Sequence, residues 1–285
     1  MIHSIFDRIG APILFILFVL LFIFETKFQL RKRIQNRWQR ILTNLLSAIP
    51  SFTLLRFLFL PVMVWLAYKN EALHIGLNYL YALPSWIEAS ISFLVLDYGN
   101  YLWHVLNHKV PLLWRFHLVH HTDPDLDITT AFRFHFGEMI GSLFFRGAFV
   151  FLTGATPLIV LIYEIVFEAA TQFHHCNWKL PIRLEKVLNK IVVTPRMHGI
   201  HHSVVKLETD SNYSVIFSCW DRLHNTIRLN VKQRQIISGV ASYNDPEELT
   251  TGFLFKLPFS TIRPFEKATE TGKDDSWIDK EKLAE

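Results

Sequence analysis

The sequence predicts an all-α integral membrane protein, with about three transmembrane helices, a helical membrane hairpin and a cytosolic helical cap that carries clustered histidines. Three observations lead to this prediction. Hydrophobic residues make up 51% of the 285-residue chain and fall in long uncharged runs, which is typical of membrane proteins. Eight of the fourteen histidines lie within residues 104–121 and 198–202, at spacings that place them on helix faces. Basic residues gather between the first two apolar runs.

The first apolar run, residues 9–24, has no charged residue and is just long enough to cross a bilayer. A secretory signal peptide is the alternative interpretation. The flanks argue against it, because Asp7 and Arg8 do not make a basic n-region, no small-residue cleavage site follows, and the positive charge comes after the run. We therefore expect an anchor helix.

The basic segment, residues 27–40, carries six Lys and Arg residues, and no Asp or Glu occurs from residue 26 to residue 70. By the positive-inside rule this segment lies in the cytosol. Two environments fit it equally well. It is either a solvated loop or a segment that rests on anionic lipid headgroups.

Two more spans are expected at residues 51–68 and 86–103. Residues 139–153 and 157–173 then form a hairpin around a short Gly/Pro turn. Each limb is short for a full crossing, so the hairpin returns to the side from which it came. With this topology every histidine cluster lies on the side of the basic segment.

The histidines fall into three motifs, which are H-x3-H and two copies of H-x2-HH. Their members are His104 and His108; His117, His120 and His121; and His198, His201 and His202. A lone histidine is most often a hydrogen-bonded structural residue, but neutral imidazole is also a preferred ligand of Fe, Zn, Cu and Ni. Eight nitrogens are too many for one tetrahedral ion and enough for two metal ions. We therefore expect a two-metal site.

Two further groups are unusual in apolar helices. Asp97 shares a helix face with His104 and His108, so it either orients a ligand histidine or makes a structural hydrogen bond to a neighbouring helix. Arg146 lies at nearly the same depth in the hairpin as Glu164. The two charges are expected to pair, because an unpaired charge in hydrocarbon is costly.

The motifs together resemble the fatty acid hydroxylase or sterol desaturase superfamily. The resemblance extends to RFHFGE at residues 133–138, QFHHCNWKLP at 172–181, PRMHGIHHS at 195–203 and NYSVIFSCWDRLHNT at 212–226. It covers roughly residues 97–228, and the two ends of the chain carry no such signature. The sequence His224-Asn225-Thr226 departs from the commoner Phe-Gly-Thr, which leaves the role of that loop open.

The resemblance implies a membrane oxygenase that holds two iron ions and uses O2 as co-substrate. Carried over by motif, the metal ligands and catalytic residues are the eight histidines of the three motifs, and His175 is an additional metal ligand. Members of the family take electrons from a separate donor, here expected to be cytochrome b5- or ferredoxin-like, and hydroxylate or desaturate a C–H bond of a membrane lipid. The residue four before His175 is Thr171 instead of a histidine. His174, His135 and Gln172 are weaker candidates.

Other classes of function fit less well. No G-x-G-x-x-G fingerprint is present, so the electrons come from outside the chain, and no basic-aromatic module indicates a nucleic-acid partner. A zinc-dependent membrane lipid hydrolase and a metal-binding or transport protein are the two alternatives. Cys176 and Cys219 form no disulfide framework. The sequence does not separate hydroxylase from desaturase, or a bacterial inner membrane from the endoplasmic reticulum.

The expected division of the chain has three parts. Residues 1–90 are membrane anchor helices with the basic cytosolic segment, residues 91–230 are a catalytic domain of the fatty acid hydroxylase type, and residues 231–285 are a C-terminal cytosolic extension, partly flexible.

Overall fold

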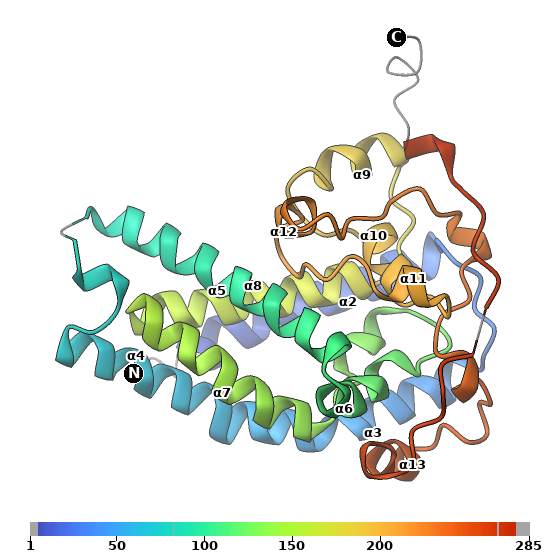
Figure 1. The fold of residues 1–285 in the computed structure, drawn as a ribbon, viewed down its shortest axis with the longest axis horizontal. Coiled ribbons are helices and arrows are strands. Elements are labelled where there is room, and N and C mark those ends of the chain that lie inside the picture. Colours follow the sequence, from blue (N-terminus) through green and yellow to red (C-terminus); the bar gives the residue numbers. More distant parts are fainter. Residues whose placement is uncertain (1–4, 82, 267, 278–285) are drawn as a thin grey trace.

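The structure is a computed structural model that describes residues 5–81, 83–266 and 268–277. Within these ranges it is all-helical, with isolated bridges and no strand, which confirms the predicted fold class. Long helices run beside one another and extend to one side, while short helices gather at the other end (Figure 1). The long helices are α2 (Ala11–Lys27), α3 (Arg37–Leu54), α4 (Leu60–Leu73), α5 (Ser85–Lys109), α6 (Pro111–His121), α7 (Phe136–Thr153) and α8 (Pro157–His175). The short ones are α9 (Ile182–Leu188), α10 (Pro195–His201), α11 (Lys206–Thr209), α12 (Cys219–Leu223) and α13 (Thr251–Lys256).

Three helical stretches of the described chain are long and apolar enough to cross a membrane: Phe6–Lys27, Arg37–Tyr79 and Phe136–Thr153. The first contains the expected anchor. The second begins earlier than expected, because Asn36 caps α3 by accepting hydrogen bonds from the backbone N–H groups of Trp38 and Gln39.

The expected third span is wrong in its position. Residues 86–103 lie in α5, which does not reach the apolar character of a span, whereas α7 does. The reason is the composition of the C-terminal half of α5, where Asp97, Asn100 and His104 are all buried within the protein. This helix is therefore built to contact protein along one face, not lipid alone.

The two-helix hairpin is confirmed as α7 and α8, but the expectation that each limb is short for a full crossing is wrong for α7, which is long and apolar enough to cross. Gly154 ends α7 with a left-handed backbone, at φ 71°, and Thr156 caps α8 by accepting from Ile159 N–H at 3.4 Å. The expected contact between Arg146 and Glu164 is also confirmed, since the guanidinium donates to the carboxylate. The same guanidinium lies 4.6 Å from the centre of the Phe167 ring. This interaction ties the two limbs together inside the apolar region.

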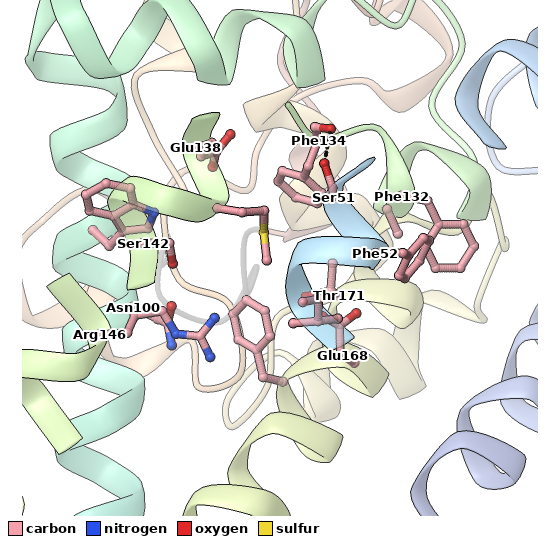
Figure 2. Close-up of a pocket in the computed structure, with 15 residues that line it drawn as sticks. Ser51, Phe52, Asn100, Phe132, Phe134, Glu138, Ser142, Arg146, Glu168 and Thr171 are labelled. Carbon is pink, nitrogen blue, oxygen red and sulfur yellow. Dashed lines mark hydrogen bonds between the residues drawn. The ribbon is translucent and has the colours of Figure 1, made fainter. Parts of the chain in front are cut away.

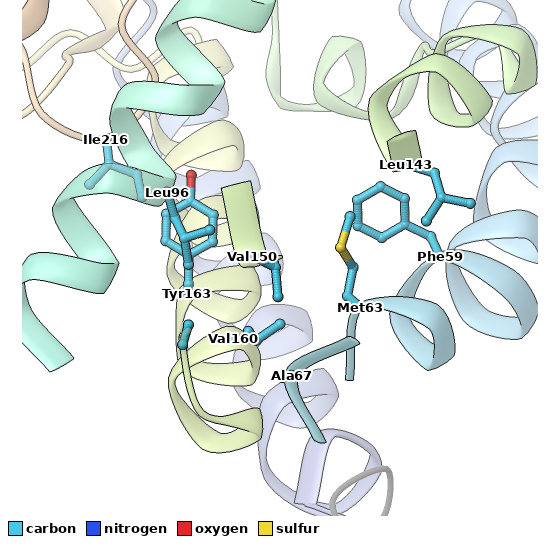
Figure 3. Close-up of a cluster of buried hydrophobic side chains, with 10 residues drawn as sticks. Phe59, Met63, Ala67, Leu96, Leu143, Val150, Val160, Tyr163 and Ile216 are labelled. Carbon is cyan, nitrogen blue, oxygen red and sulfur yellow. The ribbon is translucent and has the colours of Figure 1, made fainter. Parts of the chain in front are cut away.

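A buried apolar cluster joins the long helices and fixes their relative positions. It includes Phe59, Met63 and Ala67 from the second helical stretch, Leu96 from α5, Leu143 and Val150 from α7, and Val160 and Tyr163 from α8 (Figure 3). Because α5 and α8 pack on the same cluster, their C-terminal ends, which carry histidines, emerge near one another.

The expectation of a solvated loop is wrong for Arg31 and Arg40, which are buried in the protein, whereas Lys27, Lys32 and Trp38 of the basic segment are exposed. Contact of the segment with lipid headgroups stays a prediction. Arg40 is 4% exposed and donates to Asp123 Oδ2 at 2.7 Å, to the Asp125 carbonyl at 2.6 Å and to the Asp127 carboxylate. We call these four residues the arginine clasp. It holds the loop that directly follows His121 against the start of α3.

Further members of the basic segment are also enclosed. Arg33 and Arg37 donate to the buried carboxylate of Glu25 at 3.2 and 3.1 Å. Arg31 donates to Gln233 Oε1 at 2.6 Å and lies so close to Gly199 that a Cβ there would come within 2.1 Å of its Nη1. The arginines of the segment therefore connect the anchor helices to the histidine-bearing loops.

Candidate metal centre

The three histidine motifs are carried by the ends of helices that meet. His104 and His108 lie in the last turns of α5, and His117, His120 and His121 end α6. The helix is interrupted between these two motifs because Pro111 begins α6. The preceding residue, Val110, is extended, at φ −96° and ψ 115°. The other histidines come from the end of α8, from α10 and from its C-cap residue.

All nine predicted ligand residues are buried and fall into two groups, and within each group the candidate ligand atoms lie within 4.8 Å of one another. The five-histidine group consists of His104, His108, His117, His121 and His201. The four-histidine group consists of His120, His175, His198 and His202. Both H-x2-HH motifs contribute to both groups. Their role as metal ligands stays a prediction.

The spacing of the ring nitrogens fits a shared ion. Nε2 of His175 lies 3.0 Å from Nε2 of His120 and 3.0 Å from Nε2 of His198, and Nε2 of His202 lies 3.1 Å from the latter. Nitrogens bound at about 2.1 Å to one ion lie roughly 3.0–3.4 Å apart for octahedral to tetrahedral angles. In the five-histidine group, Nε2 of His117 and Nε2 of His121 are 3.2 Å apart.

Hydrogen bonds fix which ring nitrogen is free. Nδ1 of His104, His175 and His201 lies 2.7, 2.8 and 2.7 Å from the backbone carbonyls of Tyr213, Thr171 and Ser211. A carbonyl only accepts, so each Nδ1 carries the proton and each Nε2 carries the lone pair. Nε2 of His104 and Nε2 of His201 are buried without any hydrogen-bond partner in the described chain. Orphaned lone pairs that converge are what a metal ion requires.

Burial also favours the neutral, metal-binding form of these side chains. It lowers the pKa of His120, His198 and His202 well below the usual range, and the neighbouring histidines lower it further. An imidazole that remains neutral keeps its lone pair available to a metal.

The weaker candidates lie outside both groups. His174 packs against His198, at 4.1 Å between ring centres, but its Nδ1 contacts the Val215 carbonyl at 3.2 Å. Nδ1 of His135 caps α7 by accepting from Gly137 N–H at 3.0 Å. Gln172 faces an apolar groove. None of the three is placed to complete a group.

Asp97 does not orient a histidine, so this alternative is wrong. Its Oδ2 accepts from the indole N–H of Trp220 at 2.7 Å and from Phe217 N–H at 3.1 Å. The other alternative, a structural bond to a neighbouring helix, is confirmed, since Trp220 belongs to α12.

The role of a ligand-orienting carboxylate belongs instead to Glu138, to which we assigned no function from sequence. Its Oε1 accepts from Nδ1 of His117 at 3.0 Å and from Asn107 Nδ2 at 3.2 Å, while Oε2 has no partner in the described chain. The RFHFGE segment was the only signal for it, and this motif does not reveal which histidine the carboxylate meets.

The His224-Asn225-Thr226 turn keeps a defined structure despite its departure from the commoner motif. The His224 ring stacks on Tyr101, at 5.0 Å between ring centres, and its Nε2 lies 3.1 Å from the Tyr98 hydroxyl. Asn225 has φ 56°, a conformation that glycine favours and asparagine tolerates. Thr226 donates to Asp221 at 2.6 Å.

Three adjoining cavities lead from the outer surface to the histidines. The outer groove, about 500 Å³, lies between α2 and the second helical stretch, and Phe15, 68% exposed, lies at its rim. The inner chamber, about 90 Å³, shares Phe52, Leu55, Phe132 and Glu168 with the groove (Figure 2). The histidine cavity, about 60 Å³, shares Asn100, Trp103, Phe134, Glu138, Phe167 and Thr171 with the chamber and is lined by histidines of both groups. A mostly apolar route therefore ends at the candidate metal centre.

A family model described as fatty acid hydroxylase matches residues 89–226, the segment that holds all nine histidines. This segment is similar to the fatty acid hydroxylase superfamily. The chain is 31% identical over 183 residues to the ornithine lipid hydroxylase OlsE of Rhizobium tropici, covering 62% of this chain and 52% of that protein. It is 32% identical over 141 residues to alkylglycerol monooxygenase of Xenopus tropicalis, covering 48% and 29%. It is 26% identical over 163 residues to cholesterol 25-hydroxylase of Rattus norvegicus, covering 56% and 53%.

The chain thus matches about half the length, or less, of these relatives. No solved structure matches it. The similarity to the family lies in the histidine-bearing segment.

Replacing Glu138 by glutamine tests its orienting role. Glutamine keeps the shape but removes the charge that supports the His117 ring, so we expect metal affinity to fall by about 10- to 100-fold. The measurement is metal retained after dialysis against graded chelator. Glu208→Gln is the matched control, a buried carboxylate that binds Thr271 and lies outside both histidine groups. Equal retention in the two variants would contradict the role of Glu138.

Proposed function

We propose that this chain is a membrane-bound, non-haem di-iron oxygenase that oxidises a C–H bond of a lipid. The observation that carries the proposal is the pair of convergent, buried histidine groups at the inner end of a mostly apolar route. Similarity to the superfamily supports it, as do the names of the relatives, which are hydroxylases and monooxygenases of lipids.

In this proposal the nine histidines hold two iron ions, which supply the chemistry of O2 reduction when bound. For a hydroxylation, one O2, two electrons, two protons and the lipid C–H give the lipid alcohol and water. A desaturation consumes the same oxidant and electrons, forms a C=C bond and gives two waters. The electrons come from a separate carrier, cytochrome b5- or ferredoxin-like.

The chain's own residues hold the histidine rings in place, receive the lipid substrate and keep bulk water out. Backbone carbonyls and Glu138 hold the rings of His104, His117, His175 and His201 with Nε2 pointing inward. The apolar walls of the route receive the alkyl part of the substrate from the bilayer and keep bulk water away from the reacting carbon. We further propose that the histidine end of the molecule faces the cytosol.

A zinc-dependent lipid hydrolase is the second candidate, favoured by one observation. Such an enzyme needs a carboxylate base beside its metal, and Glu138 lines the histidine cavity with a free Oε2. Against it, two groups of four and five histidines leave few open positions for water on a tetrahedral ion.

The deciding experiment combines metal analysis with oxygen labelling. Purified full-length protein is supplied with a chemical reductant, membrane lipid extract and isotopically labelled O2, and the products are read by mass spectrometry. We expect iron in the protein and O2-dependent product, with label in the lipid for a hydroxylase or in water for a desaturase. Activity with zinc alone, or turnover that continues without O2, would show that the oxygenase proposal is wrong.

A further inference from the structure

Glu168 occupies the boundary between the outer groove and the inner chamber. It lies on α8, is half-buried by its neighbours, and lines both cavities. No hydrogen bond or ion pair joins its carboxyl group to any residue that the structure describes. A half-buried carboxyl group between apolar helices that accepts no hydrogen bond is costly where its surroundings are lipid, so a partner is expected from outside the chain.

Two of the nearby donors, Arg146 and Asn100, are already engaged. The Arg146 guanidinium donates to Glu164 and lies over the rings of Phe59 and Phe167, at 4.7 and 4.6 Å from their centres. The Asn100 amide donates to the Tyr163 hydroxyl. Arg146 and Asn100 lie on one side of the inner chamber, and Glu168 lies on the other with Thr171 (Figure 2).

On the side of the chamber that Glu168 occupies, its carboxyl oxygens can therefore accept a hydrogen bond from a ligand. One helical turn further on, toward His175, the Thr171 hydroxyl is buried and has no hydrogen-bond partner among the described residues. A purely hydrocarbon chain would leave both groups unsatisfied. A ligand with a hydroxyl or ammonium group would satisfy Glu168 while its chain continues along the chamber.

We propose that Glu168 selects lipid substrates that carry a hydrogen-bond donor, binding a hydroxyl or ammonium group at the mouth of the inner chamber. This inference rests on the proposed function, since it takes the chamber to be the substrate site. Glu168 and His175 are seven residues apart on α8, a rise of about 10 Å. The carbon that reaches the histidine cavity is thus several bonds from the donor group.

The test is competitive binding without turnover. Full-length, metal-loaded protein in lipid nanodiscs is incubated without O2 or reductant with equimolar pairs of 1-hexadecanol and hexadecyl methyl ether, or hexadecylamine and the same ether. Native mass spectrometry gives the ratio of bound ligands. The ether has the chain and the oxygen but no donor, so the ratio isolates the hydrogen bond.

We expect wild-type protein to prefer at least one donor over the ether by about ten- to a hundredfold, the range of a hydrogen bond to a charged group. Glu168→Leu should bring the ratio near one while the ether still binds. Glu71→Leu, an exposed carboxylate on α4, should leave the ratio unchanged. The Glu168→Gln protein distinguishes the two donors. If it still prefers 1-hexadecanol over the ether, the bound group is a hydroxyl; if it no longer prefers hexadecylamine over the ether, the bound group is an ammonium.

Two results would overturn the inference. One is wild-type protein that binds the ether as well as both donors. The other is Glu168→Leu protein that keeps the wild-type ratio. Because no O2, reductant or product enters the measurement, the binding preference and the oxygenase proposal succeed or fail separately.

Discussion

The His120→Ala variant is expected to lose lipid oxidation and to retain less metal than wild-type protein, with bound iron falling from about two ions per chain toward one. His120 belongs to the smaller group, in which its Nε2 lies 3.0 Å from that of His175. Alanine removes one of four ligands there and none from the five-histidine group. Iron content by elemental analysis and product by mass spectrometry measure the two effects.

The matched control is His74→Asn. His74 ends α4 with φ 52°, which asparagine tolerates, and it belongs to neither histidine group. It should keep both iron and activity. Full activity in the His120 variant, or equal iron in the two proteins, would remove His120 from the proposed metal centre.

Breaking the arginine clasp is the second change for which we expect a large effect. Arg40→Met leaves the carboxylates of Asp123 and Asp127 buried without their main cationic partner. Removing one partner of a buried ion pair typically costs about 3–5 kcal/mol, which corresponds to a fall in Tm on the order of 10 °C. The measurement is thermal unfolding of the purified protein in detergent.

A second substitution distinguishes charge from packing. Asp127→Asn added to Arg40→Met removes one of the stranded charges and should restore part of the lost stability. Arg263→Met breaks an exposed pair with Glu248 and should shift Tm much less. An Arg40→Met protein as stable as the Arg263→Met protein would mean that the clasp does not stabilise the fold.

The features that depend on the regular spacing of residues along a helix could be predicted from the sequence. Spacings of three and four residues predicted that the eight histidines of the three motifs converge, and the structure places them in two groups, together with His175, which the resemblance supplied. The expectation that each H-x2-HH triplet faces one way is wrong, because each triplet is divided between the two groups. The depth of Arg146 and Glu164 on two limbs of one hairpin predicted their contact in the same way.

Features that depend on distant segments could not be predicted. Both environments expected for the basic segment, solvent and lipid headgroups, place its charges outside the protein, and nothing in residues 27–40 shows that three aspartates some eighty residues later will enclose Arg40. The same limit explains Asp97, whose partner Trp220 is 123 residues away. The third span was misplaced because the polar residues of α5 were read as a functional stripe within a span.

The division of each H-x2-HH motif between the two histidine groups has a consequence for assembly. In α6, His117 and His121 point to one group and His120 to the other; in α10, His201 points to one group while His198 and the C-cap His202 point to the other. Each bound ion would therefore cross-link segments about eighty residues apart, and the first to bind would hold α6 and α10 in the register that the second requires. Loading should be cooperative, and inserting one residue within either motif should disable both sites together.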